Sequence, residues 1–410
     1  MTAGGDFRLA THVENHPRGL RYHRDMSHVR AVPSKLPSGG VSIFAVMTRL
    51  SNEVGAINLS QGFPDFDASP ELIESVARFM REGHNQYAPM PGVLALREAL
   101  SLKIEKLYGR RYDPVTEITV TTGSTEGLFA TITALVHPGD EVLLFQPAYD
   151  SYTPAVTLSG GTPVYATLRY PHYRIDWDEV KRKVSSRTRA IVINSPHNPT
   201  GMIWTSDDIR ELTRVLQTTD AVVVADEVYE HILFDGARHE SLARYPEIAE
   251  RAVVISSFAK TYTTTGWKVG YCAAPAALTS AIQGVHQWIT FAVNTPIQMA
   301  YAEAVRRDPD CRDITAFYQG RRDTFLALTK ASRFRPLTCE GTFFQMFDYS
   351  EITREADADF AIRLTREHGV AAIPISPFLY EGEQPGPVLR FCFAKRDETL
   401  ERAAERLVKV

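Results

Sequence analysis

Two lysines lie eight residues apart in the segment SSFAKTYTTTGWKVGY, residues 256–271, which continues an apolar run. A lysine near a protein core is costly, because its ammonium group loses hydration unless an anion or a chemical task compensates. A desolvated lysine beside a second cation has a lowered pKa and can form a Schiff base with a carbonyl compound. Lys260 and Lys268 are therefore either two surface lysines, the simpler interpretation of an isolated pair, or parts of a reactive site.

A pair of carboxylates ends another apolar run. In AVVVADEVY, Asp226 and Glu227 follow an unbroken series of small apolar residues. A carboxylate at such a place needs a cation or several hydrogen-bond donors nearby to remain ionised. Helix capping is the alternative interpretation. Tyr229 adds a phenol three residues after Asp226, at the distance of one helical turn.

Two turn segments also follow apolar runs. In TTGSTEG, Gly123 allows a tight turn, and the amides of Ser124 and Thr125 would point outward at the positive end of a helix, where phosphate binds. The alternative is that Ser124 or Thr125 only caps that helix. The segment NSPHNPTG, residues 194–201, predicts a rigid turn that presents the side-chain amide of Asn198. A purely structural turn is the alternative there.

All of these residues would lie at one edge of a sheet. Between about residues 90 and 275, apolar runs alternate with helical patterns, which argues for a largely parallel sheet covered on both faces. The predicted strands are 117–123, 140–147, 189–196, 220–227, 251–258 and 268–274. Ligands of open parallel sheets bind beyond the carboxyl ends of the strands. A phosphate site, an acid, a phenol, an amide and an amine at these ends form the set that holds pyridoxal phosphate.

Length and composition limit the classes of protein to which the chain can belong. The 410 residues suffice for two domains, and 44% apolar with 23% charged residues is typical of a soluble globular protein. The net charge of −4 gives no basic excess that would indicate a nucleic-acid partner. No run approaches the roughly 18 apolar residues of a membrane helix. Residues 1–32 lack the apolar core of a secretory signal, and we expect a poorly ordered extension there. The 4 cysteines are widely spaced, without a metal-binding or redox pair, which favours the reduced cytoplasm.

The sequence also resembles the fold-type-I, pyridoxal-phosphate-dependent aminotransferases of class I and II. Within them it is most similar to the bacterial methionine aminotransferases and the kynurenine/glutamine transaminase group. The resemblance begins at residue 33, reaches the C-terminus, and includes INLSQGFPDFD, NQYAPMPGVLALREAL, NSPHNPTG, DEVYEH, KTYTTTGWKVGYC and LRFCFAK. It implies a large cofactor-binding domain (67–300) with a mostly parallel seven-stranded sheet between helices, and a small α+β domain (301–410). Residues 33–66 are expected to pack with the small domain.

The resemblance assigns roles around pyridoxal 5'-phosphate. Lys260 corresponds to the lysine that forms the Schiff base, and Lys268 to the cation that partners the phosphate. Asp226 corresponds to the carboxylate paired with the pyridine nitrogen. Further expected contacts are the phosphate-binding residues Gly123, Ser124, Thr125 and Ser257, the donors Asn198 and Tyr229 to the phenolic oxygen, and the stacking ring of Tyr149. Tyr87 corresponds to a tyrosine that reaches the neighbouring subunit's phosphate, which implies a homodimer with shared active sites.

Arg390 in VLRFCFAK is the candidate for binding the substrate. A guanidinium suits bidentate capture of a carboxylate, although a half-exposed strand residue with a surface ion pair is the alternative. The resemblance places the α-carboxylate at Arg390, with a backbone donor at Gly62 and with Asn198 beside it. Phe44 stands where related enzymes carry an aromatic pocket residue, and such a pocket favours methionine or phenylalanine over aspartate. Further candidates for this pocket, each of which could instead be a core residue, are Phe63 and Phe343.

We therefore expect an aminotransferase that moves the α-amino group of methionine and other large neutral or aromatic amino acids to a 2-oxo acid, with ping-pong kinetics. The alternatives on the same cofactor are β-elimination of sulfur-substituted cysteines and kynurenine or glutamine transamination. The segment HQWITFAVNTP, residues 286–296, differs from the kynurenine transaminases and makes kynurenine a less favoured substrate. A non-catalytic, cofactor-binding regulator is the alternative from another class; intact Lys260, Asp226 and Arg390 argue against it.

Overall fold

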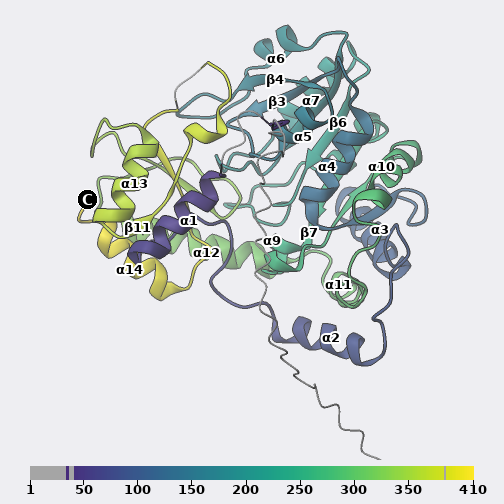
Figure 1. Ribbon diagram of the computed structural model, residues 1–410, viewed down its shortest axis with the longest axis horizontal. Helices are drawn as coiled ribbons and strands as arrows, with labels where there is room; N and C mark the ends of the chain where they lie inside the picture. The colour runs from purple at the N-terminus through teal and green to yellow at the C-terminus, as the bar shows by residue number, and fades with distance from the viewer. Residues whose placement is uncertain (1–33, 37–40, 383–384) are drawn as a thin grey trace, which may run out of the picture.

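The chain folds into a large region around one open sheet and a smaller α+β region beside it (Figure 1). This computed structural model describes residues 34–36, 41–382 and 385–410. The extension expected over residues 1–32 lies outside the described residues. No helix in the described part of the chain combines the length and the hydropathy that crossing a bilayer requires.

The large region is built on a seven-stranded sheet in the order β2-β8-β7-β6-β5-β3-β4. Its strands are β2 (Ile118–Thr121), β3 (Glu141–Gln146), β4 (Thr162–Thr167), β5 (Thr188–Asn194), β6 (Val222–Asp226), β7 (Ala252–Ser257) and β8 (Gly270–Ala273). β8 pairs antiparallel with both β2 and β7, and the other neighbours are parallel. The predicted, mostly parallel seven-stranded sheet is therefore confirmed.

Helices cover both faces of this sheet, because successive side chains of a strand point to opposite faces. In β3, Val142 and Leu144 pack with one helix layer, and Leu143 and Phe145 pack with the other. The first layer consists of α4 (Gly123–Leu135), α5 (Tyr152–Leu158) and α10 (Ala276–Ile289). The second includes α3 (Leu94–Tyr108), α6 (Trp177–Lys183), α7 (Ser206–Leu216) and α8 (Pro246–Ala249). Helix α11 (Thr295–Arg307) packs on α3 and on α2 (Pro70–Arg81).

The smaller region contains a four-stranded antiparallel sheet in the order β12-β13-β10-β9. Its strands are β9 (Arg335–Pro336), β10 (Phe344–Asp348), β12 (Ile373–Pro374) and β13 (Val388–Cys392). Its helices are α12 (Arg312–Thr329), α13 (Asp357–Glu367) and α14 (Asp397–Leu407). This α+β unit agrees with the predicted fold class.

A segment from the start of the described chain lies within the smaller region. Helix α1 (Ile43–Val54), purple in Figure 1, packs on α13 near the C-terminus. The short strand β1 (Ile57–Asn58) pairs in parallel with β11 (Val370–Ala371). Residues that are more than 300 positions apart in the sequence are thereby brought together in the smaller region.

Candidate active site

A cavity of about 140 Å³ opens at the carboxyl ends of β5, β6 and β7. A buried water needs roughly 10–15 Å³, so the cavity has room for a small ligand. It is lined by every predicted cofactor residue except Tyr87. Lining residues that the sequence did not predict are Tyr152, Asn194, Val228, Ala259 and Thr265. The strand ends meet because the parallel strands β5, β6 and β7 are adjacent.

Asp226 is the last residue of β6 and is 4% exposed. Its Oδ2 accepts a hydrogen bond of 2.6 Å from the Tyr152 hydroxyl, and its Oδ1 accepts one of 3.4 Å from the amide of Val228. Burial raises the pKa of Asp226 to about 6, although the hydrogen bond from Tyr152 acts in the opposite direction. A cation in the cavity would restore the ionised form. The residues after Asp226 form a turn and no helix, so the capping interpretation is wrong.

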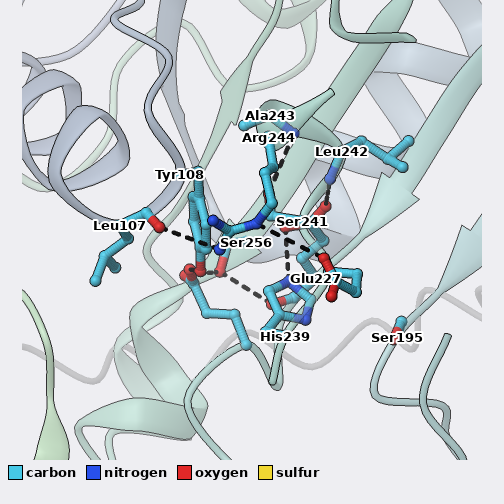
Figure 2. A network of polar contacts seen from close by, with 12 residues as sticks. Leu107, Tyr108, Ser195, Glu227, His239, Ser241, Leu242, Ala243, Arg244 and Ser256 are labelled. Carbon is cyan, nitrogen blue, oxygen red and sulfur yellow. Dashed lines mark hydrogen bonds and ion pairs between the residues drawn. The ribbon is translucent and has the colours of Figure 1, made fainter. Parts of the chain in front are cut away.

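Glu227, the neighbouring carboxylate, does not line the cavity and lies in a buried polar network (Figure 2). It lies 2.9 Å from Nε2 of His239 and accepts a hydrogen bond of 3.0 Å from the amide of Leu242. The hydroxyl of Ser256, in β7, lies 3.4 Å from the carbonyl of Glu227. The two adjacent acids therefore have different roles: Asp226 faces the cavity, and Glu227 stabilises the chain behind it.

A second buried glutamate holds the same turn. Glu230 accepts hydrogen bonds from Lys103 (2.6 Å), Tyr108 (2.6 Å) and Ser256 (2.9 Å). Although burial acts against the charge of Lys103, the adjacent carboxylate of Glu230 leaves the pKa of Lys103 above its usual value. Because Glu230 follows Tyr229 directly, this ion pair fixes the position of the phenol that lines the cavity.

Lys260 lies in the one-turn helix α9 (Phe258–Thr261), directly after β7. The hydroxyl of Ser257 caps this turn by accepting a hydrogen bond of 3.1 Å from the amide of Ala259. The Lys260 amine is 3.4 Å from the carbonyl oxygen of Gly62. Burial lowers the pKa of Lys260 to about 8, and the nearby charges of Lys268 and Arg390 act in the same direction. A substantial fraction of this amine is therefore neutral, and nucleophilic, near physiological pH.

Lys268 lies over the predicted phosphate-binding turn. A Cβ atom on Gly123 would lie 3.3 Å from the Lys268 amine, so that amine is close to the start of α4. Gly123 has a φ of +71°, which favours glycine, and a Cβ atom on Gly270 would lie 2.8 Å from the amide nitrogen of Ser124. The N-cap residue of α4 is Thr122, without a side-chain capping bond. The interpretation of Ser124 or Thr125 as a mere helix cap is therefore wrong.

The local structure around Lys268 differs from the prediction in one detail. Lys268 was expected to begin a strand, but β8 starts at Gly270. Lys268 instead has a φ of 52°, in the left-handed region, after the 3-10 turn η2 (Thr265–Trp267). This conformation is uncommon for a residue with a Cβ atom and costs about 1–2 kcal/mol. It turns the chain so that the lysine precedes the strand and its amine reaches Gly123.

Arg390 is 1% exposed in β13. Its Nη1 donates to Oδ1 of Asn198 at 2.6 Å, and its Nη2 donates to the carbonyl of Ser60 at 3.2 Å. Its Nε has no hydrogen-bond partner, and in the described ranges no carboxylate forms an ion pair with it. Burial lowers its pKa to about 10. The interpretation as a half-exposed residue with a surface ion pair is wrong, because this guanidinium is buried without an anion.

Aromatic rings surround the guanidinium. Its Cζ lies 3.8 Å from the ring centroid of Phe344 and 5.2 Å from that of Phe44, which is half-buried in α1. Phe378, in the 3-10 turn η3 (Ser376–Phe378), contacts Phe44 edge to face at 5.8 Å and was not predicted. The Phe343 ring lies 5.4 Å from the Lys260 amine. Phe63, by contrast, is 43% exposed.

Two residues that the sequence analysis missed organise the site. Tyr152 follows Tyr149 at helical spacing, and the two rings meet edge to face at 5.6 Å. Asn194 donates to the backbone carbonyl of Asp226 at 2.9 Å, and its Oδ1 accepts from the amide of Asn198 at 2.8 Å. Asn194 thus connects the ends of β5 and β6. Its position directly after an apolar run was the signal that could have identified it.

Tyr87 lies outside the cavity of its own chain. Its side chain is 84% exposed and contacts the ring of Phe291 edge to face at 5.4 Å. Phe291 itself is 52% exposed and Trp288 is 84% exposed. Trp288 lies in the last turn of α10 and Phe291 follows that helix, so exposed aromatic rings are concentrated near its end in the described part of the single chain.

The fold is that of a fold-type-I transferase, and comparison with known proteins specifies the family. The family model for aminotransferases of class I and II matches residues 54–407. The chain therefore belongs to the class I and II aminotransferases and is an enzyme of that kind.

Individual relatives cover nearly the whole chain. It is 49% identical to a methionine aminotransferase of Escherichia coli, over 91% of this chain and 97% of the relative. It is 37% identical to a probable N-succinyldiaminopimelate aminotransferase of Mycobacterium tuberculosis, with the same coverage. The crystal structure of E. coli YbdL, described as having a methionine aminotransferase function, superposes with a TM-score of 0.90 at 48% identity, covering 93% of this chain and all of that one (100%).

Proposed function

We propose that this enzyme uses pyridoxal 5'-phosphate to move the α-amino group of methionine, and of other large neutral or aromatic amino acids, to a 2-oxo acid. The observation that carries the proposal is that one cavity combines the lowered-pKa amine of Lys260 with the buried carboxylate of Asp226. The buried guanidinium of Arg390 joins this site through Asn198.

The residues present fit pyridoxal phosphate. The first turn of α4 and the amine of Lys268 offer amides and a cation for a phosphate group. Asp226 is a buried acid whose ionised form needs a cation nearby. The protonated ring nitrogen of the cofactor would be such a cation. Lys260 offers an amine that is partly neutral near physiological pH and can bond to an aldehyde.

When bound, the cofactor supplies an aldehyde for the amine and a ring that accepts the electrons released when the α C–H bond breaks. Lys260 would hold the cofactor covalently, and its Nζ, once free, would accept the α-proton and return it. Asp226 would keep the ring nitrogen protonated, and Tyr152 keeps Asp226 oriented through its hydroxyl. Arg390 would bind the α-carboxylate and so orient the α C–H bond relative to Lys260.

The aromatic surroundings support large apolar substrates. Phe44, Phe378 and Phe344 lie around the guanidinium that would bind the carboxylate, so the substrate's side chain would meet apolar rings. The E. coli relative, named a methionine aminotransferase, agrees with this preference. β-Elimination on the same cofactor, or transamination of kynurenine or glutamine, would use the same residues and remains as the second candidate. This candidate is supported by a kynurenine–oxoglutarate transaminase of Dictyostelium discoideum, which is 34% identical over 92% of this chain and 96% of the relative.

We further propose a homodimer in which Tyr87 reaches the phosphate group of the neighbouring subunit. The exposed rings of Tyr87, Trp288 and Phe291 support an interface at this place. We also propose that residues 67–300 form a large cofactor-binding domain and that residues 33–66 pack with a small domain of residues 301–410, which the packing of α1 on α13 supports. The four buried, free cysteines agree with a reduced compartment such as the cytoplasm.

The test is a substrate panel on the purified holoenzyme. With methionine and several 2-oxo acids, we expect the methionine-derived oxo acid to form, whereas no conversion with any acceptor would reject the proposal. For β-elimination, sulfur-substituted cysteines are supplied without a 2-oxo acid. Pyruvate and thiol released at a higher rate than the transamination product would favour that second candidate.

A further inference from the structure

The motif LRFCFAK ends in Lys395, a lysine that the proposed reaction does not use. Its side chain is 3% exposed, and in the part of the chain that the structure describes it forms no ion pair with a carboxylate. Its Nζ donates to the carbonyl oxygen of Phe63 at 2.8 Å and lies 4.9 Å from the ring centroid of Phe63. A buried ammonium group without an anion is costly. The hydrogen bond therefore stabilises both the Lys395 ammonium and the Phe63 carbonyl that accepts it.

Phe63 belongs to a segment that we call the strap, residues 59–65. The strap crosses from β1 toward α2 and is bonded along its length to β13 and to the start of α14. Its other bonds to this region are Cys392 N to Leu59 O (2.8 Å), Arg390 Nη2 to Ser60 O (3.2 Å), Arg396 N to Asp65 Oδ1 (2.6 Å) and Thr399 Oγ1 to Asp65 Oδ2 (2.7 Å).

The middle of the strap faces the reactive groups. The carbonyl oxygen of Gly62 lies 3.4 Å from the Lys260 amine, and a Cβ atom on Gly62 would lie 2.8 Å from the Phe344 ring. The side chain of Gln61 donates to the carbonyl of Phe44 at 3.2 Å and so connects the strap to the aromatic rings. Between the anchors at Ser60 and Asp65, Lys395 supplies a bond directly beside Gly62. Lys395 itself does not line the cavity.

We propose that Lys395 is a positioning residue for the substrate's α-carboxylate, acting through the strap. Its ammonium group holds the Gly62–Phe63 backbone at a fixed distance from Lys260 and Arg390, so that the backbone at Gly62 is preorganised for the incoming amino acid. The proposal rests on the proposed aminotransferase function. It concerns the binding of the substrate; the predicted phosphate-binding turn at Gly123 begins helix α4 and is not part of the strap.

The test uses the holoenzyme with Lys395→Met, which keeps the length of the side chain but removes the donor, and with Lys395→Arg, which keeps a cationic donor. Lys330→Met, at an exposed lysine that follows α12, is the matched control. We expect Lys395→Met to raise KM for methionine roughly tenfold while kcat stays within about twofold, since a bond of this kind orders a binding surface. Lys395→Arg should restore most of the affinity, and the control should change nothing.

Hydrogen exchange of the substrate-free protein provides a readout that does not depend on activity. We expect faster exchange of the strap amides in Lys395→Met, and unchanged exchange in α4. A wild-type KM, unchanged strap exchange, or a loss of cofactor binding in place of a KM effect would each overturn the proposal. If wild-type protein transaminates no amino acid, the proposed function fails, but the exchange result still reports on the strap.

A second variant keeps the test decisive if Lys395→Met does not fold. Thr399→Val removes the hydroxyl that donates to Asp65 at the far end of the strap, on a partly exposed surface. We expect it to raise KM severalfold and to speed the exchange of the strap amides. If both quantities stay at their wild-type values, the strap does not position the substrate, and the proposed role of Lys395 is wrong.

Discussion

Removing one hydroxyl group should move the pH at which the enzyme loses its cofactor. In Tyr152→Phe, Asp226 loses the donor that lies 2.6 Å from its Oδ2. A hydrogen bond to a charged group contributes about 1.5–3 kcal/mol, and about 1.4 kcal/mol corresponds to one pH unit. The pKa of Asp226, about 6 in the cofactor-free chain, should therefore rise by about 1–2 pH units. The carboxylate of the variant would then be partly protonated at neutral pH.

The assay is the dissociation constant of pyridoxal phosphate, measured by titration between about pH 5 and 9. Protonated Asp226 cannot balance a protonated ring nitrogen, so affinity should fall on the acid side of the profile. The midpoint of that fall should lie about 1–2 pH units higher in Tyr152→Phe than in wild type. Tyr112→Phe is the matched control, because Tyr112 is also buried but its hydroxyl has no hydrogen-bond partner among the described residues.

The stability of the cofactor-free protein gives a second readout of the same pKa. The folded chain raises the pKa of Asp226 above its ordinary value of 3.8, so the folded state holds a proton that the unfolded state releases. The contribution of this group is thus fully present below about pH 4 and is lost as pH rises through about 6, a total of about 3 kcal/mol. In Tyr152→Phe, this loss should continue to about pH 7–8. Identical pH profiles for variant and wild type would refute the assigned role of Tyr152.

Three further perturbations test other parts of the site. Arg390→Lys should lower kcat/KM for methionine by roughly 10- to 100-fold, because one ammonium cannot replace a bidentate guanidinium; a change below twofold would contradict its role. Lys103→Met should lower the free energy of unfolding by about 3–5 kcal/mol in urea denaturation, because it leaves Glu230 buried without its cation. Arg335→Met, which breaks an exposed ion pair, should cost less than about 1 kcal/mol, and equal effects of the two would be inconsistent with this account. Tyr87→Phe should weaken pyridoxal phosphate binding at least about tenfold without changing the dimer mass in sedimentation, and unchanged affinity would exclude a phosphate contact by its hydroxyl.

Asp226 and Lys260, at the ends of β6 and β7, could be predicted because each comes directly after or closely follows an apolar run. An apolar run marks a buried strand, and parallel strands bring their carboxyl ends together, so Asp226 and Lys260 could be placed at one edge from the sequence alone. β4 was missed as a strand for a physical reason. It lies at the edge of the sheet, where half-exposed residues and Pro163 interrupt the apolar pattern.

Contacts between distant segments could not be predicted in this way. Tyr152 and Asp226 are 74 positions apart, and a tyrosine at helical spacing is usually a core residue. Lys395 and Phe63 are 332 positions apart, so no local pattern indicates that Lys395 bonds to the strap beside Gly62. Phe378 likewise reaches Phe44 only because the C-terminal region folds against α1.

Peptide mapping of the holoenzyme can identify the lysine that carries the cofactor. Borohydride treatment of the holoenzyme makes the bond between cofactor and lysine permanent, and mass spectrometry of a digest locates the added pyridoxyl group. We expect the label on the peptide that contains Lys260, and no label in Lys260→Ala. A label on Lys268, or one that persists in Lys260→Ala, would contradict this expectation.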